Sequence, residues 1–453
     1  MSKGILNSLN LRWEIIIVGS MCLGYAALML CRTTVGIAGP AMLLDDELNL
    51  DKTAFGAILG WGTAGNLLGK LTNGVLADKL GGHKVFIFAI ALSAAAIFMF
   101  GTVSTNGAFF IFYFLTIFAK SAGWPSIANI IKVWFLYPKH GRVWGFIATS
   151  SRASSVAATL VLGSLLLVMS WRGLFVAAAV ISVVIMLVLL KFLRSRPPDV
   201  TELSTEAAET VNLLTAWSQN HPLRELETRE ALSFFAKSPR FWLICLSVTF
   251  LSVLFEFQAF IPIYLSETFE LAPAQAGMAS SAFPLGCLVA VFAGGFVFDK
   301  LSKKTLIFAL GGMLVLAFFC LLLLWSLANI QLNTQLELML TIGTIFTFGF
   351  AISPAYYLPM SVFSIDFGGK HCGLLIGLID AVAYSGTMVF DFVGGSVADQ
   401  EGGWQSFLLI LVMTAVGATI TMVLFLYADY RDSMIEKREE IRTANNRTAK
   451  NRT

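Results

Sequence analysis

Long apolar runs dominate this sequence. Hydrophobic residues make up 57% of the 453 residues and charged residues only 13%, about half the share that is usual in globular proteins. The charges cluster, so they leave runs of about twenty or more apolar residues, each able to cross a hydrocarbon core of roughly 30 Å. These runs predict twelve membrane-spanning helices, near residues 14–43, 51–77, 85–103, 107–135, 143–169, 173–194, 240–266, 275–298, 305–328, 335–364, 371–398 and 404–428.

A short, basic, glycine-rich turn joins the second and third of these spans. It reads Gly74-Val-Leu-Ala-Asp78-Lys79-Leu-Gly81-Gly82-His83-Lys84. A looser copy, Gly295-Phe-Val-Phe-Asp299-Lys300-Leu-Ser-Lys303-Lys304, follows 221 residues later, counted from Asp78 to Asp299. Two six-helix halves of the same topology would repeat such a turn at about half the chain length. The repeat therefore predicts an all-α polytopic membrane protein with twelve transmembrane helices in two pseudo-symmetric six-helix bundles.

Charge is distributed unevenly over the connections between spans. Basic residues gather in alternate connections and near the C-terminus, whereas the other connections carry Asp45, Asp46, Glu47, Glu267, Glu270, Glu337 and Glu401. Basic connections stay in the cytoplasm, so both termini are expected there. The basic runs thus indicate the topology of a multi-pass protein in the lipid bilayer of a bacterial-type inner membrane, and no nucleic-acid partner is expected.

The same pattern divides the chain into four predicted parts. Residues 1–194 form an N-terminal six-helix bundle, 195–239 a cytoplasmic linker, 240–430 a C-terminal six-helix bundle and 431–453 a basic cytoplasmic tail. Arg196-Pro197-Pro198 ends the sixth span, because proline cannot continue a helix. Charged pieces of the linker, 205–209 and 225–232, look helical and partly amphipathic. The six cysteines show no metal-like spacing, so neither a metal nor a cofactor is expected.

Seven ionisable residues lie well inside the predicted spans: the cations Arg32, Lys70, Lys120 and Arg152 in the first bundle, and the acids Glu256, Asp380 and Asp391 in the second. Each costs about 2.5–3.5 kcal/mol near the bilayer centre, so pairing or function is expected. A salt bridge or a nearby membrane surface explains Lys70 and Asp391 most readily. Arg32 can reach neither surface and needs a counter-charge, which Glu256 or Asp380 could supply across the interface between the bundles.

Helical spacing groups several polar side chains on shared faces. Tyr25 and Arg32 are seven residues apart, and Lys120 and Trp124 are four apart, so each pair shares a face of its helix. A guanidinium offers a fixed fork of donors to carboxylate or phosphate oxygens, and a lysine adds a mobile point charge. The pattern predicts an anion site of Arg32, Tyr25, Lys70, Lys120, Trp124 and Arg152, with Glu256, Asp380, Asp391 and Asp78 as coupling or gating residues.

These motifs resemble the major facilitator superfamily, and within it the organophosphate:phosphate antiporter family. The likeness covers nearly the whole chain and is carried by the turn at 74–84, Tyr25-x6-Arg32-x7-Pro40, Gly69-Lys70-x3-Gly74 and Gly123-Trp124-Pro125. It implies the major facilitator fold and a glycerol-phosphate or hexose-phosphate transporter, or a related sugar-phosphate sensor. It further implies that Arg32 binds the phosphate, that Lys70 assists, that Tyr25 hydrogen-bonds the substrate, and that the turn around Asp78 holds a cytoplasmic gate closed.

The chain also departs from that family. Its sugar-phosphate carriers place a second arginine on the seventh span, where this chain has Glu256 and no cation. Hexose-phosphate relatives place a lysine on the eleventh span, where this chain has only Asp380 and Asp391. The predicted anion site thus lies in the first bundle and faces an acidic second bundle. This polarity suits a zwitterion such as an amino acid as well as a phosphate ester, and it suits proton coupling through Glu256 or Asp380.

The sequence favours a secondary active transporter for a small organic anion, working as a monomer by alternating access, with a proton or phosphate as the coupling ion. A phosphate ester is the expected substrate, and an amino acid or another carboxylate is the alternative. A transporter-like sensor would share the pocket. An enzyme is not expected, because the four histidines lie in loops or at span edges without a nucleophile–base pair. The ATP-binding pattern Gly-x4-Gly-Lys-Ser/Thr does not occur.

Overall fold

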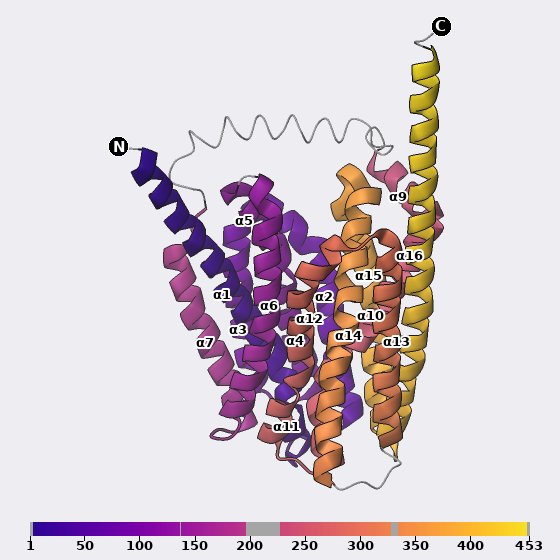
Figure 1. The fold of residues 1–453 in the computed structure, drawn as a ribbon. Coiled ribbons are helices and arrows are strands. Elements are labelled where there is room, and N and C mark those ends of the chain that lie inside the picture. Colours follow the sequence, from indigo (N-terminus) through magenta and orange to yellow (C-terminus); the bar gives the residue numbers. More distant parts are fainter. Residues whose placement is uncertain (1–2, 136, 196–226, 328–333, 451–453) are drawn as a thin grey trace.

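The computed structural model describes residues 3–135, 137–195, 227–327 and 334–450, and these residues fold into helices joined by short connections. Figure 1 shows the long helices running side by side, with α1 starting and α16 ending at the same end of the molecule. We call this the terminal end and the opposite one the distal end. The described residues form an all-helical protein, as the sequence predicted.

The helices before residue 195 form what we call the first half. They are α1 (Lys3–Leu43), α2 (Lys52–Leu80), α3 (Gly82–Thr102), α4 (Asn106–Ser121), α5 (Gly123–Trp134), α6 (Tyr137–Leu165) and α7 (Trp171–Phe192). The second half begins at residue 239. It contains α10 (Pro239–Phe269), α11 (Pro273–Ala279), α12 (Ala282–Val297), α13 (Lys303–Leu327), α14 (Thr334–Gly368), α15 (Cys372–Ala398) and α16 (Gly403–Lys450).

Ten segments of the described chain are long and apolar enough to cross a membrane. The two predicted spans that are not among them, 51–77 and 143–169, coincide with α2 and α6, each 29 residues long. Both helices contain many glycine, serine or threonine residues and one cation of the predicted site, Lys70 or Arg152, which lower their hydropathy. Both also pack against the other half, α2 on α15 and α6 on α11 and α12.

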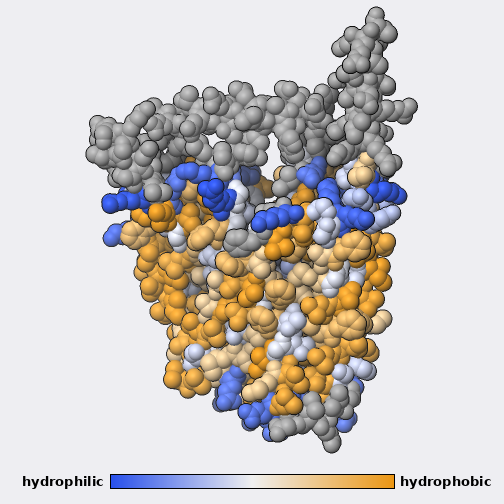
Figure 2. All heavy atoms as spheres, viewed as in Figure 1, coloured by the Kyte–Doolittle hydropathy of each residue, from blue (hydrophilic) through white to orange (hydrophobic). Residues whose placement is uncertain are grey.

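The surface carries an apolar belt of the kind expected for a protein surrounded by lipid. In Figure 2, hydrophobic residues cover the middle of the visible face, and hydrophilic residues gather toward its two ends. Exposed side chains such as Phe88, Leu187, Phe292 and Phe308 contribute to the apolar surface. Apolar side chains facing outward in this number cannot be explained by burial in a soluble core, so the belt supports the assignment to a multi-pass membrane protein.

Two of the predicted spans are each built from two helices. Span 107–135 breaks at Ala122 into α4 and α5, and span 275–298 breaks before Ala282 into α11 and α12. Pro125 and Pro284 follow the breaks by a few residues, and neither can donate to the carbonyl four positions earlier. The sequence analysis treated both spans as continuous, although the prolines signalled the interruptions.

The turn between α2 and α3 is reduced to one residue. Gly81 has a φ of +88°, a left-handed conformation that L side chains rarely adopt, and it lies between the last residue of α2 and the first residue of α3. A turn thus joins the second and third spans as predicted, but residues 74–80 belong to α2 and 82–84 to α3, so the turn is one residue and not the stretch 74–84.

Part of the predicted linker packs on the second half. Helix α9 (Thr228–Lys237) buries Phe235, whose ring contacts those of Phe241 and Phe367. Residues 196–226, including the predicted helical piece at 205–209, lie outside the described residues. The boundaries of the linker stay a prediction.

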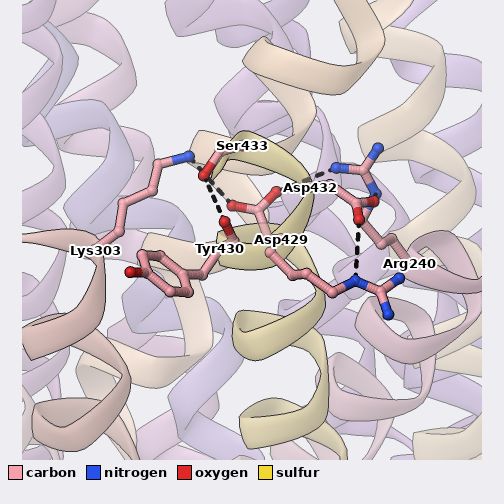
Figure 3. Close-up of polar contacts among 7 residues, drawn as sticks. Arg240, Lys303, Asp429, Tyr430, Asp432 and Ser433 are labelled. Carbon is pink, nitrogen blue, oxygen red and sulfur yellow. Dashed lines mark hydrogen bonds and ion pairs between the residues drawn. The ribbon is translucent and has the colours of Figure 1, made fainter. Parts of the chain in front are cut away.

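A cluster of charges holds the terminal end of the second half together (Figure 3). Arg240 at the start of α10 lies 3.6 Å from Asp429 and 3.2 Å from Asp432 of α16, and Lys303 at the start of α13 lies 3.4 Å from Asp429. Helix α16 continues through the predicted tail to Lys450 and projects beyond the other helices (Figure 1). The sequence analysis ended this last span at 428, where apolar residues give way to charged ones, although many of those charged residues are good helix formers.

Helices α2 and α15 pack against each other at the interface between the two halves and run antiparallel. Residue numbers rise along α2 as they fall along α15, from Thr53 opposite Asp399 at the distal end to Lys70 opposite Asp380. The closest approach is at Gly56, where an added Cβ would lie 2.5 Å from the carbonyl oxygen of Asp391 and 2.7 Å from Cα of Gly395. Small residues allow such close packing of helices in a membrane.

We expect Gly56→Val to separate α2 from α15 at the distal end. Overpacking of this kind costs about 1–3 kcal/mol, which shifts the equilibrium away from this conformation by roughly 5- to 150-fold. Distances between spin labels on the two helices measure the shift. Gly74→Val is the matched control, because an added Cβ at Gly74 on the same helix meets no atom within 4 Å. Unchanged label distances in Gly56→Val would show that the contact at Gly56 does not hold α2 and α15 together at the distal end.

Candidate functional site

A pocket lies between the two halves. Its lining includes Arg32 of α1, Tyr113 of α4, Ser155 of α6, and Glu256 and Gln258 of α10. The first three residues belong to the first half and the last two to the second. A solute bound there would contact both halves at once, which is the arrangement that a transporter needs if its binding site is to couple to their relative movement.

Arg32 meets an acid of the opposite half in this pocket. Its Nη2 lies 3.6 Å from Oε2 of Glu256, and 40% of the arginine side chain is exposed against 14% of the glutamate side chain. The separation is that of an ion pair rather than a tight bidentate hydrogen bond. The guanidinium therefore keeps donors that a bound anion could use. The predicted counter-charge is present, and of the two candidates it is Glu256 rather than Asp380.

Asp380 pairs with Lys70 instead. Lys70 Nζ lies 2.7 Å from Oδ2 of Asp380, whose side chain is only 6% exposed, and the ammonium also lies 5.8 Å from the ring centre of Tyr384. The sequence analysis gave weight to Lys70 reaching the membrane surface. Of the two explanations offered there, the salt bridge is confirmed and the membrane surface is not, because the tight pair across α2 and α15 holds the ammonium between the halves.

Lys120 is the cation without a close partner. It lies one residue before the end of α4, next to the break at Ala122, and its ammonium makes no hydrogen bond or ion pair with any described residue. Arg32, Lys70 and Arg152 repel its charge, and Glu256 attracts it. A partly exposed cation surrounded mainly by other cations is a strong attractor for an anion.

Arg152 is held by aromatic faces rather than by an acid. Its guanidinium carbon lies 4.6 Å from the ring centre of Tyr357 and 5.7 Å from that of Phe255, both in the second half. Cation–π contacts of this kind stabilise a desolvated cation without neutralising its charge. The sequence analysis did not identify Tyr357; its neighbours Pro354 and Pro359 inside α14 were the available signal of a special segment.

Tyr25 and Trp124 form an aromatic layer next to these cations. Their ring centres are 5.2 Å apart, and Trp124 also lies 4.9 Å from Trp144. Tyr25 is within electrostatic reach of Arg152, Arg32 and Lys70. The structure thus brings the residues predicted from helical spacing to one side of the interface. Trp144, which lies on α6, was missed because no spacing rule links it to Trp124.

Asp391 lies inside the protein. It is 0% exposed, and the Thr63 hydroxyl donates to its Oδ2 at 2.6 Å. The sequence analysis offered a salt bridge or a nearby membrane surface for Asp391. The structure shows no ion pair for it among the described residues and buries it under α2, near the close contact at Gly56.

Asp78 lies apart from the pocket. It is exposed, and it accepts a hydrogen bond from Nδ2 of Asn129 at 3.4 Å, while Oδ1 of Asn129 accepts one from the N–H of Gly82 at 2.9 Å. The aspartate is thereby connected to the start of α3 and to α5, all within the first half. Its gating role stays a prediction.

The distal end of the interface is closed by polar contacts. Lys52 Nζ lies 2.9 Å from Glu267, and the Lys52 N–H and the Thr53 hydroxyl donate to the carboxylate of Asp399 at 3.1 and 3.0 Å. Trp404 donates to the same Glu267 at 2.7 Å. The sequence analysis named Glu267 only as an acidic residue of a connection, because its partner Lys52 lies 215 residues away in the chain.

The sequence model of the Major Facilitator Superfamily matches residues 21–369 and 260–449. The chain is 24% identical to a probable hexose phosphate transport protein of Chlamydia trachomatis, over 91% of this chain and 90% of that protein. It is also 24% identical to the membrane sensor protein UhpC of Escherichia coli K12, over 92% of this chain and 93% of that protein. The crystal structure of a mutant of the nucleoside transporter NupG superimposes with a TM-score of 0.67 and 16% identity, covering 90% of this chain and 99% of that chain.

Proposed function

The chain belongs to the Major Facilitator Superfamily, and from this we propose that it is a secondary active transporter. Its substrate is a small organic anion, a phosphate ester such as a sugar phosphate or glycerol phosphate, which it moves across the inner membrane by alternating access. The observation that carries the proposal is the group of four cations at the interface between the halves, of which Lys120 has no close counter-ion among the described residues. The similarity to a probable hexose phosphate transport protein supports the same substrate class.

The proposed architecture has twelve transmembrane helices in two bundles of six. Helices α2 and α6 are added to the ten apolar segments to give twelve spans. Among the ten, α4–α5 and α11–α12 each count as one broken span. The basic connections support a cytoplasmic terminal end. In this orientation the contacts of Lys52, Thr53 and Asp399 close the outer side. Substrate then reaches the pocket from the cytoplasm in this conformation and from outside when those contacts part.

In the proposed mechanism, the anion takes the place of Glu256 at Arg32. The guanidinium offers two parallel donors to phosphate oxygens, Lys120 adds a second positive charge, and Tyr25 hydrogen-bonds the substrate. The exchange links binding to movement, because the Arg32–Glu256 pair joins the two halves. A ligand shifts a conformational equilibrium only through unequal affinity for the two states, and replacing a contact between the halves creates that inequality.

The variant Lys120→Gln tests whether Lys120 contributes to ligand binding or to the stability of the protein. Because the ammonium has no ion pair with any described residue, its removal should leave the thermal stability of the protein unchanged or raise it. Affinity for a sugar phosphate should fall by about 1–3 kcal/mol, or roughly 5- to 150-fold, through the loss of one charge-assisted hydrogen bond. Isothermal titration calorimetry and thermal unfolding measure the two effects. A destabilised variant with normal affinity would assign Lys120 a structural role.

A ligand screen tests the proposed substrate class. A ligand that binds only the native state at 100 times its Kd adds about 2.7 kcal/mol to the free energy of unfolding, which a thermal-shift assay detects. We expect glucose 6-phosphate and glycerol 3-phosphate to stabilise the purified protein more than glucose, glycerol, dicarboxylates or amino acids do. Stabilisation by amino acids or dicarboxylates alone would favour the carboxylate alternative, in which the substrate's carboxylate binds Arg32.

A sensor is the second candidate, favoured by the similarity to UhpC. Sensor and transporter would bind the same ligand, so binding does not separate them. Uptake of radiolabelled sugar phosphate into proteoliposomes does, and we expect uptake above that of empty liposomes. Ligand stabilisation without uptake would assign the chain to sensing.

A further inference from the structure

Arg194 is an exposed cation that pairs with no acid in the part of the chain that the structure describes. It lies two residues beyond Phe192, the last residue of α7, at the terminal end of the first half. Its guanidinium carbon lies 4.2 Å from the ring centre of Trp13 on α1, and its carbonyl oxygen accepts a hydrogen bond from Nε1 of Trp134 at 3.0 Å. The ring centres of Trp13 and Trp134 are 6.4 Å apart. Two tryptophans, from α1 and α5, thus hold the arginine at the end of α7.

The acids at this end of the first half have other partners. Glu14, the residue after Trp13, pairs with Lys139 at 2.7 Å, and Asp78 accepts its hydrogen bond from Asn129. The described cations at the same end are Arg12, Lys79, Lys84, Lys132, Lys139, Arg142, Lys191 and Arg194. Cations thus clearly outnumber acids there, and the described residues leave an excess of positive charge that attracts anions.

The contact with Trp13 leaves the donors of the guanidinium available. A cation–π contact uses the face of the guanidinium, whereas its N–H groups lie in its plane and point outward from its edge. No described residue accepts a hydrogen bond from the Arg194 side chain. A planar fork of donors binds two phosphate oxygens at once. Arg194 is therefore suited to bind a phosphate group that approaches from outside the protein.

An exposed apolar surface leads from Arg194 toward the middle of the protein. Val184, Leu187 and Leu190 of α7 are each more than half exposed, and so is Ile15 of α1. Helices α1 and α7 pack together at one edge of the molecule (Figure 1), and Figure 2 shows this edge as part of the apolar belt. Lipid chains cover such a belt, and tryptophan and arginine are typical of its boundary with water. Arg194 thus lies where the headgroups of the surrounding lipid are expected.

We propose that Arg194 and Trp13 form a binding site for the headgroup of an anionic phospholipid, such as phosphatidylglycerol, in the leaflet at the terminal end. The guanidinium binds the lipid phosphate, Trp13 holds the guanidinium in place, and the acyl chains lie along α1 and α7. Lys191, which is exposed near the end of α7, adds a second positive charge. A zwitterionic lipid carries its own cation, which the excess positive charge repels, so the site favours a lipid with net negative charge. The site lies outside the pocket that contains Arg32 and is independent of the proposed substrate.

Native mass spectrometry of the full-length protein in detergent, titrated with phosphatidylglycerol or phosphatidylcholine, tests the site. The wild type should bind the first phosphatidylglycerol more tightly than the first phosphatidylcholine. Arg194→Gln should weaken phosphatidylglycerol binding by roughly fivefold, the effect of one cation on an anionic lipid, and leave phosphatidylcholine binding unchanged. Arg142→Gln is the matched control, because it removes the same charge from an exposed arginine at the same end that has no described partner. Its affinity should equal that of the wild type.

Trp13→Leu tests the part played by the tryptophan. It keeps every charge but removes the ring that holds the guanidinium, so phosphatidylglycerol affinity should fall toward that of Arg194→Gln. Thermal unfolding without added lipid shows whether this half-buried substitution is tolerated, and the exposed Arg194→Gln decides the proposal if it is not.

Three results would overturn the proposal. Equal wild-type affinity for the two lipids would show that the headgroup charge is not recognised. Equal losses in Arg194→Gln and Arg142→Gln would show that the overall positive charge of this end, and no particular site, attracts the lipid. Release of bound phosphatidylglycerol by inorganic phosphate at the same concentration would assign Arg194 to a soluble anion.

Discussion

Arg32→Lys should lower the affinity for a sugar phosphate by roughly 10- to 150-fold although the charge is kept. The expected loss is that of one hydrogen bond to a charged group, about 1.5–3 kcal/mol, because an ammonium cannot supply the two parallel donors of a guanidinium. Arg32 is partly exposed in the pocket and lies 3.6 Å from Glu256, so it keeps donors for a ligand. Isothermal titration calorimetry with glucose 6-phosphate measures the change.

Arg142→Lys is the matched control for this substitution. Arg142 is exposed, has no hydrogen bond or ion pair with any described residue and lies outside the pocket, so the same replacement there should leave affinity within error of the wild type. Wild-type affinity in Arg32→Lys would move the anion site away from Arg32. An equal loss in both variants would show a general effect of replacing arginine.

Asp380→Asn should destabilise the protein by about 3–5 kcal/mol. It leaves Lys70 between the halves without its counter-ion, and an uncompensated buried charge costs about this much. The pair is well placed for such an effect, since the Asp380 side chain is 6% exposed and the Lys70 side chain 22%. Unfolding of the purified protein in detergent, followed by circular dichroism, measures the loss.

The double variant Lys70→Met/Asp380→Leu tests whether the unpaired charge of Lys70 causes the loss of stability in Asp380→Asn. Replacing both partners by apolar residues removes the buried charge as well as the attraction, so stability should return to near the wild-type value. Because the pair joins α2 to α15, spin-label distances between the halves should also change in Asp380→Asn. Equal stability of Asp380→Asn and the wild type would show that water solvates Lys70 and that the pair contributes little.

The sequence predicted where the long apolar helices run, apart from the breaks inside two spans and the end of α16, and which of their residues carry unusual charge. Apolar length, basic connections and the repeated turn depend on local composition, so they can be read without knowing the fold. The expectation that Arg32 needs an acid came from the same source, because its depth in an apolar run excludes every surface partner. Gly81 marked the turn between α2 and α3 because only glycine adopts its backbone conformation readily.

Tertiary structure alone decided which cation pairs with which acid. Spacing along a helix places residues on a common face, but it does not say which face of another helix meets them. The glycine contact at Gly56 brings α2 close to α15 in one register, which pairs Lys70 with Asp380 and buries Asp391 against Thr63. Glu256 is thereby left for Arg32. The sequence by itself thus determined that cations of one half face acids of the other, and helix packing decided which of them form ion pairs.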